Sequence, residues 1–177
     1  NYDNIALKSG GGSVLYGSGA IGGSVHLNNR LRFGEGFRNK LQLEYGSFDT
    51  FFGSYTTRLS NEDSALQLNI SRYSSDNDFE YPNSEKKNEN GDFENTGINL
   101  AAGHFLNEQN LLKFYANFFN GERGFSGTLT APSNSKYEDV NSRNMLEWKG
   151  FFKEVTSTLK VAYLDETYRY FENRNRE

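Results

Sequence analysis

Three acidic residues at alternate positions are the first candidates for chemistry in this sequence. Asp76, Asp78 and Glu80 would lie on one side of an extended chain, because successive side chains of such a chain point in opposite directions. Carboxylate oxygens are the ligands that Ca²⁺ prefers, so a calcium site is one interpretation of this spacing. A solvated acidic loop is the other and the stronger one, because nothing in the sequence fixes the number of ligands.

A glycine motif makes nucleotide binding a second candidate function. Residues Gly17 to Gly22 match the G-x-G-x-x-G pattern. In dinucleotide-binding folds this pattern follows a buried strand, opens a helix, and precedes an acidic residue by about 20 positions. Here Gly23 and a strand-like stretch follow, and Phe37 stands 20 positions after Gly17. We therefore interpret the segment as a glycine-rich turn and predict no nucleotide binding.

The composition offers little to catalysis. The chain has 177 residues, no cysteine and two histidines, His26 and His104, and it shows no Ser/His/Asp or paired-carboxylate constellation. Its net charge of −4 gives no support to nucleic-acid binding, which calls for a basic face. We expect a protein that is not an enzyme, requires no cofactor and binds no nucleic acid.

A period-two alternation of apolar and polar residues predicts seven antiparallel strands, and no segment shows the helical period of 3.6. The mean hydropathy is −0.78, and no run of about 18 apolar residues could form a membrane helix. Strands that are apolar on one face only average out as polar, so a membrane β-barrel fits, and so does a soluble β-sandwich. The alternating cores are residues 41–45, 51–59, 66–70, 98–102, 112–118, 144–148 and 159–163, after a short strand at 24–28.

The expected connections alternate in length along the chain. Short ones at 60–64, 107–110 and 152–155 are separated by long polar ones at 76–95 and 121–141, although 46–50 is also short. Short turns on one side and long loops on the other are typical of outer-membrane barrels. Several aromatic residues lie toward the strand ends, where a membrane barrel carries rings of aromatic side chains at the lipid–water interface. They are Tyr45, Phe51, Phe52, Trp148, Tyr163 and Tyr168.

Aromatic residues in the long connections are candidate substrate contacts. Anchoring of the loops by packing is an equally good interpretation of the same residues. They are Phe79, Tyr81, Phe93, Phe125 and Tyr137.

The glycine-rich start of the chain carries a family resemblance. An apolar stretch ending in Lys8 is followed by a small-residue turn, then Leu-Tyr-Gly and Ala-Ile-Gly-Gly, in the order of the plug's C-terminal end in TonB-dependent outer-membrane receptors. The chain resembles that family, and its Gly- and Asn-rich character resembles receptors of the Bacteroidetes type. Ser9-Gly10 departs from the family's frequent Gly-Pro, and the last plug strand is not fully apolar. The motif residues are Lys8, Gly12, Leu15, Tyr16, Gly17, Ala20, Ile21, Gly22 and Gly23.

The resemblance implies an all-β fold, namely a fragment of a plugged antiparallel transmembrane β-barrel with about seven barrel strands. Residues 1–29 would be the C-terminal end of the plug domain, 30–39 the link, and 40–177 the N-terminal portion of the barrel. Because a plugged transporter barrel has about 22 strands, we expect the chain to be part of a longer protein.

The resemblance also implies a function. It is energised uptake of a scarce nutrient chelate, such as a siderophore, heme or cobalamin, through the outer membrane of a Gram-negative cell. The expected partners are the TonB complex, reached through plug residues outside this chain, a small chelate ligand and outer-membrane lipid. The alternatives are another outer-membrane barrel, either a porin-like channel or an adhesin, and a soluble β-sandwich binding module.

Overall fold

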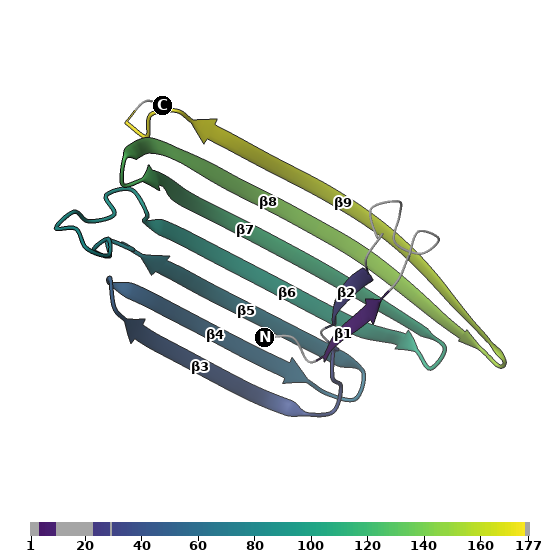
Figure 1. Cartoon of the computed structure of the whole chain (residues 1–177). Helices are drawn as coiled ribbons and strands as arrows, with labels where there is room; N and C mark the ends of the chain where they lie inside the picture. The colour runs from purple at the N-terminus through teal and green to yellow at the C-terminus, as the bar shows by residue number, and fades with distance from the viewer. Residues whose placement is uncertain (1–3, 10–22, 29, 176–177) are drawn as a thin grey trace. The chain divides into compact units, whose positions relative to one another are not determined.

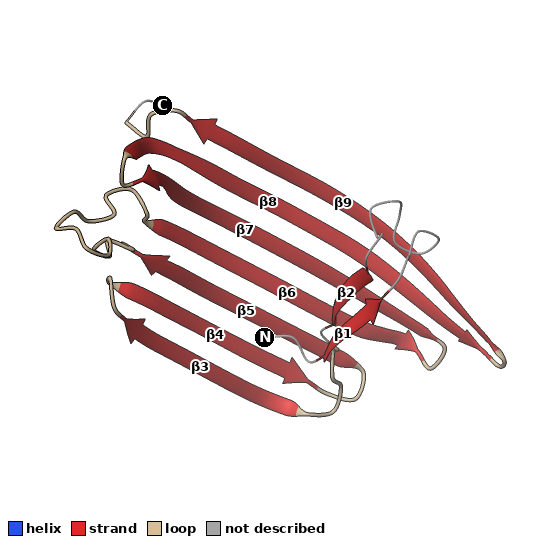
Figure 2. Cartoon of the chain, viewed as in Figure 1, coloured by secondary structure: helices blue, strands red, loops and turns tan. Residues whose placement is uncertain are grey.

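The computed structural model describes residues 4–9, 23–28 and 30–175, which form nine strands and no helix (Figure 2). Within these ranges no helix is long and apolar enough to cross a bilayer. The chain divides into two compact units, Asn1–Arg32 and Phe33–Glu177, and the boundary lies inside the predicted link. In the first unit β1 (Asn4–Ser9) pairs antiparallel with β2 (Gly23–Asn28).

The second unit is one antiparallel sheet in which every strand pairs with the next along the chain (Figure 1). All seven predicted barrel strands are present, and so is the predicted short strand at 24–28, as β2. The strands of the sheet are β3 (Gly36–Gly46), β4 (Thr50–Ser60), β5 (Ser64–Ser75), β6 (Phe93–Asn107), β7 (Asn110–Thr128), β8 (Ala131–Phe152) and β9 (Val155–Phe171).

One expected loop proves to be strand. The prediction of a long connection at 121–141 is wrong, because β7 runs to Thr128, β8 starts at Ala131, and their ladder is interrupted only by a register shift between Phe125 and Gly127. Both faces of this extension are largely polar, so the period-two signal that reveals a half-buried strand is absent there. The other long connection, between β5 and β6, is a loop over residues 76–92.

The sheet has one apolar and one polar face. Residues directly opposite each other in a ladder lie on the same face, so the register assigns every position. A row on the apolar face runs through Leu41, Tyr55, Ile70, Ile98 and Phe118. A row on the polar face runs through Thr56, Asn69, Asn99, Asn117 and Arg143.

The apolar residues form a band that ends well before the longer strands do. In β3 the band extends from Phe37 to Tyr45, whereas β7, β8 and β9 have 19, 22 and 17 residues. Beyond Phe118 of β7, the same face carries Asn120 and Glu122. We call the part of the sheet beyond the band, together with loop 76–92, the rim.

Candidate functional site at the rim

A row of aromatic rings crosses the polar face of the sheet where the band meets the rim. Phe52 of β4 and Tyr73 of β5 are directly paired, with ring centroids 6.0 Å apart, and Tyr73 lies 4.9 Å from Phe93 of β6. At the other end of the row, Tyr137 of β8 lies 5.6 Å from Tyr168 of β9. Edge and tilted ring pairs of this kind each contribute about 0.5–1.5 kcal/mol beyond the area they bury. The aromatic row therefore stiffens the rim and presents ring faces to the space over the sheet.

Arg123 of β7 fills the place between the two parts of the aromatic row. It is directly paired with Phe93 on one side and with Tyr137 on the other. Its Cζ lies 5.8 Å from the centroid of each ring, within the range in which a guanidinium is attracted to an aromatic face. The side chain remains exposed. An exposed cation is thus held between two rings near the middle of the row.

A hollow of about 480 Å³ lies beside Arg123, which is within the size range of small-molecule sites. Phe125, with 57% of its surface exposed, forms part of its wall. Arg123 is the one charged side chain in the lining, so the hollow carries a formal charge of +1. The lining residues are Tyr73, Asn77, Gly91, Phe93, Asn95, Arg123, Gly124, Phe125, Ser126 and Gly127.

Three of the five predicted substrate contacts meet at this place. Phe93 and Tyr137 flank Arg123, and Phe125 lines the hollow. Phe79 and Tyr81 lie elsewhere, in loop 76–92, where Phe79 contacts Phe48 of the β3–β4 turn at 6.4 Å and Tyr81 at 5.5 Å. Phe79 and Tyr81 therefore pack within the loop and against the β3–β4 turn, as in the alternative interpretation that these aromatic residues anchor the loops.

Loop 76–92 is fastened to the rim by two buried asparagines. Asn90 is 4% exposed, and its Nδ2 lies within hydrogen-bond distance of the carbonyl oxygens of Phe125, Ser133 and Ser135, at 3.1, 3.1 and 2.8 Å. Asn88 is 3% exposed and donates from Nδ2 to the carbonyl oxygen of Asn77 at 2.8 Å. The loop is therefore hydrogen-bonded both to itself and to the β7–β8 hairpin.

The three acidic residues of the loop are not gathered into a metal site. Lys87 Nζ lies 3.1 Å from Asp78 Oδ2, and this hydrogen bond raises the pKa of Lys87. Glu80 pairs through its backbone with the same lysine in an isolated bridge. The described part of the chain contains no group of three or more His, Asp or Glu side chains arranged to share a metal ion. Calcium binding at Asp76, Asp78 and Glu80 stays an untested prediction.

The glycine-rich motif falls largely outside the described residues. Lys8 lies in β1, where it is opposite Ser24, and Gly23 lies in β2, opposite Ser9. The remaining motif residues have no described structure: Gly12, Leu15, Tyr16, Gly17, Ala20, Ile21 and Gly22.

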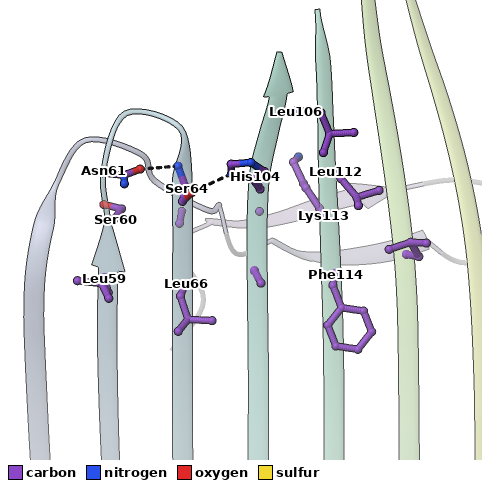
Figure 3. A pocket seen from close by; sticks show the side chains of 14 residues that line it. Leu59, Ser60, Asn61, Ser64, Leu66, His104, Leu106, Leu112, Lys113 and Phe114 are labelled. Atoms are coloured by element: carbon purple, nitrogen blue, oxygen red, sulfur yellow. Dashed lines mark hydrogen bonds between the residues drawn. The ribbon is translucent and has the colours of Figure 1, made fainter. Parts of the chain in front are cut away.

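Two further hollows lie away from the aromatic row. One of about 620 Å³ is on the opposite face of the rim, and six carboxylates and one arginine line it. The other, of about 520 Å³, is on the apolar face at the short-turn end, where leucines such as Leu59 and Leu66 surround it (Figure 3). At its edge Ser64 Oγ and His104 Nδ1 share a hydrogen bond of 2.8 Å, drawn as a dashed line in Figure 3. Neither contains a predicted ligand-contacting aromatic other than Phe93.

The sequence analysis did not identify Arg123, which lies near the middle of the aromatic row. Arg123 and Tyr137 fall in the segment that was expected to be a loop. Alternate residues of a strand lie on one face, so extending the predicted strand from Phe119 through Gly121 to Arg123 would have placed Arg123 on the polar face. Two of the predicted girdle residues, Phe52 and Tyr168, also belong to the polar face and join the row. The others, Tyr45, Phe51, Trp148 and Tyr163, lie on the apolar face.

Comparison with known proteins adds one finding about the fold. No protein-family model matches the sequence, and no curated protein matches it. Among solved structures, the chain resembles the copper transporter OprC, with a TM-score of 0.81 and 21% sequence identity. The match covers 99% of this chain and 26% of that one, so the chain spans about a quarter of the transporter's length. The predicted all-β fold class is confirmed, and nearly the whole chain has the fold of one part of a transporter.

Proposed function

We propose that this chain is part of the wall of an outer-membrane β-barrel transporter of the TonB-dependent type, and that the barrel takes up a small nutrient chelate into a Gram-negative cell. The two-faced sheet is the observation that carries the proposal. Its apolar band is nine residues long in β3, from Phe37 to Tyr45, which is the length that a tilted strand needs to cross a bilayer. The likeness to one part of a copper transporter supports it.

The charges on the polar face require water on that side. Arg143 lies near the middle of β8, in the polar row that contains Asn69 and Asn117, and Glu166 of β9 pairs with it at 2.6 Å. A charged side chain that faced lipid at mid-membrane would cost about 2–4 kcal/mol. The polar face therefore lines a wet lumen in this proposal, and the apolar face contacts lipid.

The rim is the part of this wall that would meet the cargo. Copper is one candidate, by likeness to the named transporter. However, the chain has one methionine, two histidines and no cysteine, and His104 lies on the apolar face, so few of the donors that copper prefers line this wall. We therefore assign to the aromatic row a contact with the organic part of a chelate, such as a siderophore, heme or cobalamin.

A pair of adjacent single-cysteine variants tests the membrane orientation. The chain has no cysteine of its own, and Leu68 and Asn69 of β5 lie on opposite faces. A fluorophore on Leu68→Cys of the complete protein in lipid should be quenched by a lipid-borne spin label and not by iodide. The fluorophore on Asn69→Cys should show the reverse. Quenching of both positions by iodide alone would make the sheet a soluble β-sandwich module.

Energised uptake requires a separate measurement. Cells that express the complete protein should accumulate one chelate of a panel containing copper, a ferric siderophore, heme and cobalamin. A protonophore should abolish that accumulation, because uptake of this type depends on the energised inner membrane. Accumulation of many small solutes regardless of the protonophore would instead indicate a porin-like channel.

A further inference from the structure

Arg123 differs from the other cations of strands β5 to β9. In β5 to β9, each of the other lysines and arginines has a carboxylate oxygen within 4.0 Å. Arg123 contacts two rings instead, and among the described residues no carboxylate lies within that distance of it. The paired cations are Arg72, Lys113, Lys136, Arg143, Lys149, Lys160 and Arg169.

The two faces of the rim differ in the charge of their hollows. The hollow beside Arg123 has a formal charge of +1, whereas the hollow on the opposite face is lined by six carboxylates and Arg169. The whole chain carries −4, so this hollow is positive against a negative background. A positive hollow in such a background attracts anions in preference to cations.

The chemistry of the guanidinium narrows the class of anion. Its five N–H donors lie in one plane and match the two oxygens of a carboxylate, while its faces can stack on rings. Phe93 and Tyr137 flank the group, and Tyr73 and Phe125 add ring surface to the hollow. Ring faces next to a planar cation suit a ligand in which a flat conjugated system carries the anionic group.

We propose that the hollow beside Arg123 binds a flat, conjugated organic anion, and that a planar oxyanion of the carboxylate type on this ligand pairs with Arg123. This proposal rests on the proposed function, because it names the chemical class of cargo that the rim contacts. Arg123 supplies the charge-assisted hydrogen bonds, and the rings of the row and of Phe125 supply the stacking surface.

Three small probes separate the two parts of this recognition. Naphthalene-carboxylate has the ring and the charge, naphthalene-carboxamide keeps the ring, and cyclohexane-carboxylate keeps the charge. Saturation-transfer NMR on the complete protein in lipid nanodiscs should show the tightest binding for naphthalene-carboxylate. Loss of a charge-assisted hydrogen bond weakens binding about tenfold or more. Arg123→Gln should therefore lower the affinity for naphthalene-carboxylate by that factor and leave the affinity for naphthalene-carboxamide unchanged.

Two variants control for indirect effects. Arg143→Gln removes an arginine from the same face that is already paired with Glu166, and it should leave binding of all three probes unchanged. Arg123→Lys retains the charge without the planar fork, and its affinity should lie between those of the parent and Arg123→Gln. Equal binding of the carboxylate by the parent and Arg123→Gln would overturn the proposal, as would carboxamide binding as tight as that of the carboxylate. The measurement needs no energy source, so its result is independent of the protonophore test of uptake.

Discussion

Arg174 and Asp92 form a two-point ion pair that joins the residues after β9 to the end of loop 76–92. Arg174 Nη1 lies 2.6 Å from Asp92 Oδ1, and Nη2 lies 2.8 Å from Oδ2, across a separation of 82 positions. The same guanidinium donates to Asn90 Oδ1 at 2.5 Å, and the backbone N–H of Arg174 donates to the carbonyl oxygen of Asn134 at 2.8 Å. One arginine thus connects the loop, the β7–β8 hairpin and the end of β9.

Acid should loosen this connection. The hydrogen bond from Arg174 lowers the pKa of Asp92 below its ordinary value of 3.8, and partial burial opposes the shift. A lowered pKa in the folded state means that the pair stabilises the loop fully above pH 3.8 and loses this effect as the pH falls through the lowered value. A partly exposed pair contributes up to about 1 kcal/mol, so the hydrogen-exchange protection factors of loop 76–92, which compare each rate with the intrinsic rate at the same pH, should fall up to about fivefold on acidification.

The matched variant for this pH dependence is Asp92→Asn. At neutral pH it should lower the protection factors of the loop to the values that the parent reaches in acid, and further acidification should then leave these factors nearly unchanged. A parent and variant with the same pH profile would show that Asp92 does not control the loop.

Removing the Asn90 side chain should free the loop at any pH. In Asn90→Ala, the carbonyl oxygens of Phe125, Ser133 and Ser135 lose their shared donor, which is expected to cost about 1–3 kcal/mol of local stability. Limited proteolysis should then cut loop 76–92 at least about fivefold faster than in the parent. Glu89→Gln is the control, because the Glu89 side chain is exposed, and its cleavage rate should equal that of the parent.

The sequence predicted the band of this sheet better than its rim. The alternation of Leu66, Leu68 and Ile70 with polar residues identified β5, because one face of the strand is apolar there. Near Arg123 and Tyr137 both faces are largely polar, so the same test found no strand. Phe93, Phe125 and Tyr137 were predicted as contacts one by one, but only the register of β6 to β8 brings them together around Arg123.

The tight end of the β7–β8 hairpin should depend on Gly127. This glycine has φ +73°, and an added Cβ would overlap the carbonyl oxygen of Ala131 and approach the Ser133 nitrogen to 2.8 Å. Gly34 is a matched control, because its φ is +74° and nothing lies within 4 Å of an added Cβ. Both alanine substitutions carry a backbone strain of about 1 kcal/mol or more, and Gly127→Ala adds the steric overlap.

The difference between these two glycine variants can be measured by thermal unfolding of the complete protein. Gly127→Ala should lower the midpoint by several degrees more than Gly34→Ala, and hydrogen exchange should increase from Phe125 to Ser135. Equal effects of the two variants would mean that the hairpin end shifts to accommodate the methyl group.

Glu147 should be the most important carboxylate on the polar face of the sheet. It is 5% exposed and lies within 4.0 Å of Lys113, Lys149 and Lys160, so one negative charge compensates three positive charges. Glu147→Gln would leave these lysines facing one another. The expected loss is about 2 kcal/mol, below the 3–5 kcal/mol typical of a broken buried pair, because Lys160 is half-exposed and can move into water.

An exposed pair in the same sheet supplies the comparison for Glu147. Glu166 pairs with Arg143, and about half of each side chain is exposed, so Glu166→Gln should cost at most about 1 kcal/mol. Urea unfolding of the complete protein in detergent should therefore give a clearly lower midpoint for Glu147→Gln than for Glu166→Gln, and added salt should narrow the gap by screening the lysines. Equal midpoints would show that the three lysines do not depend on Glu147 for compensation.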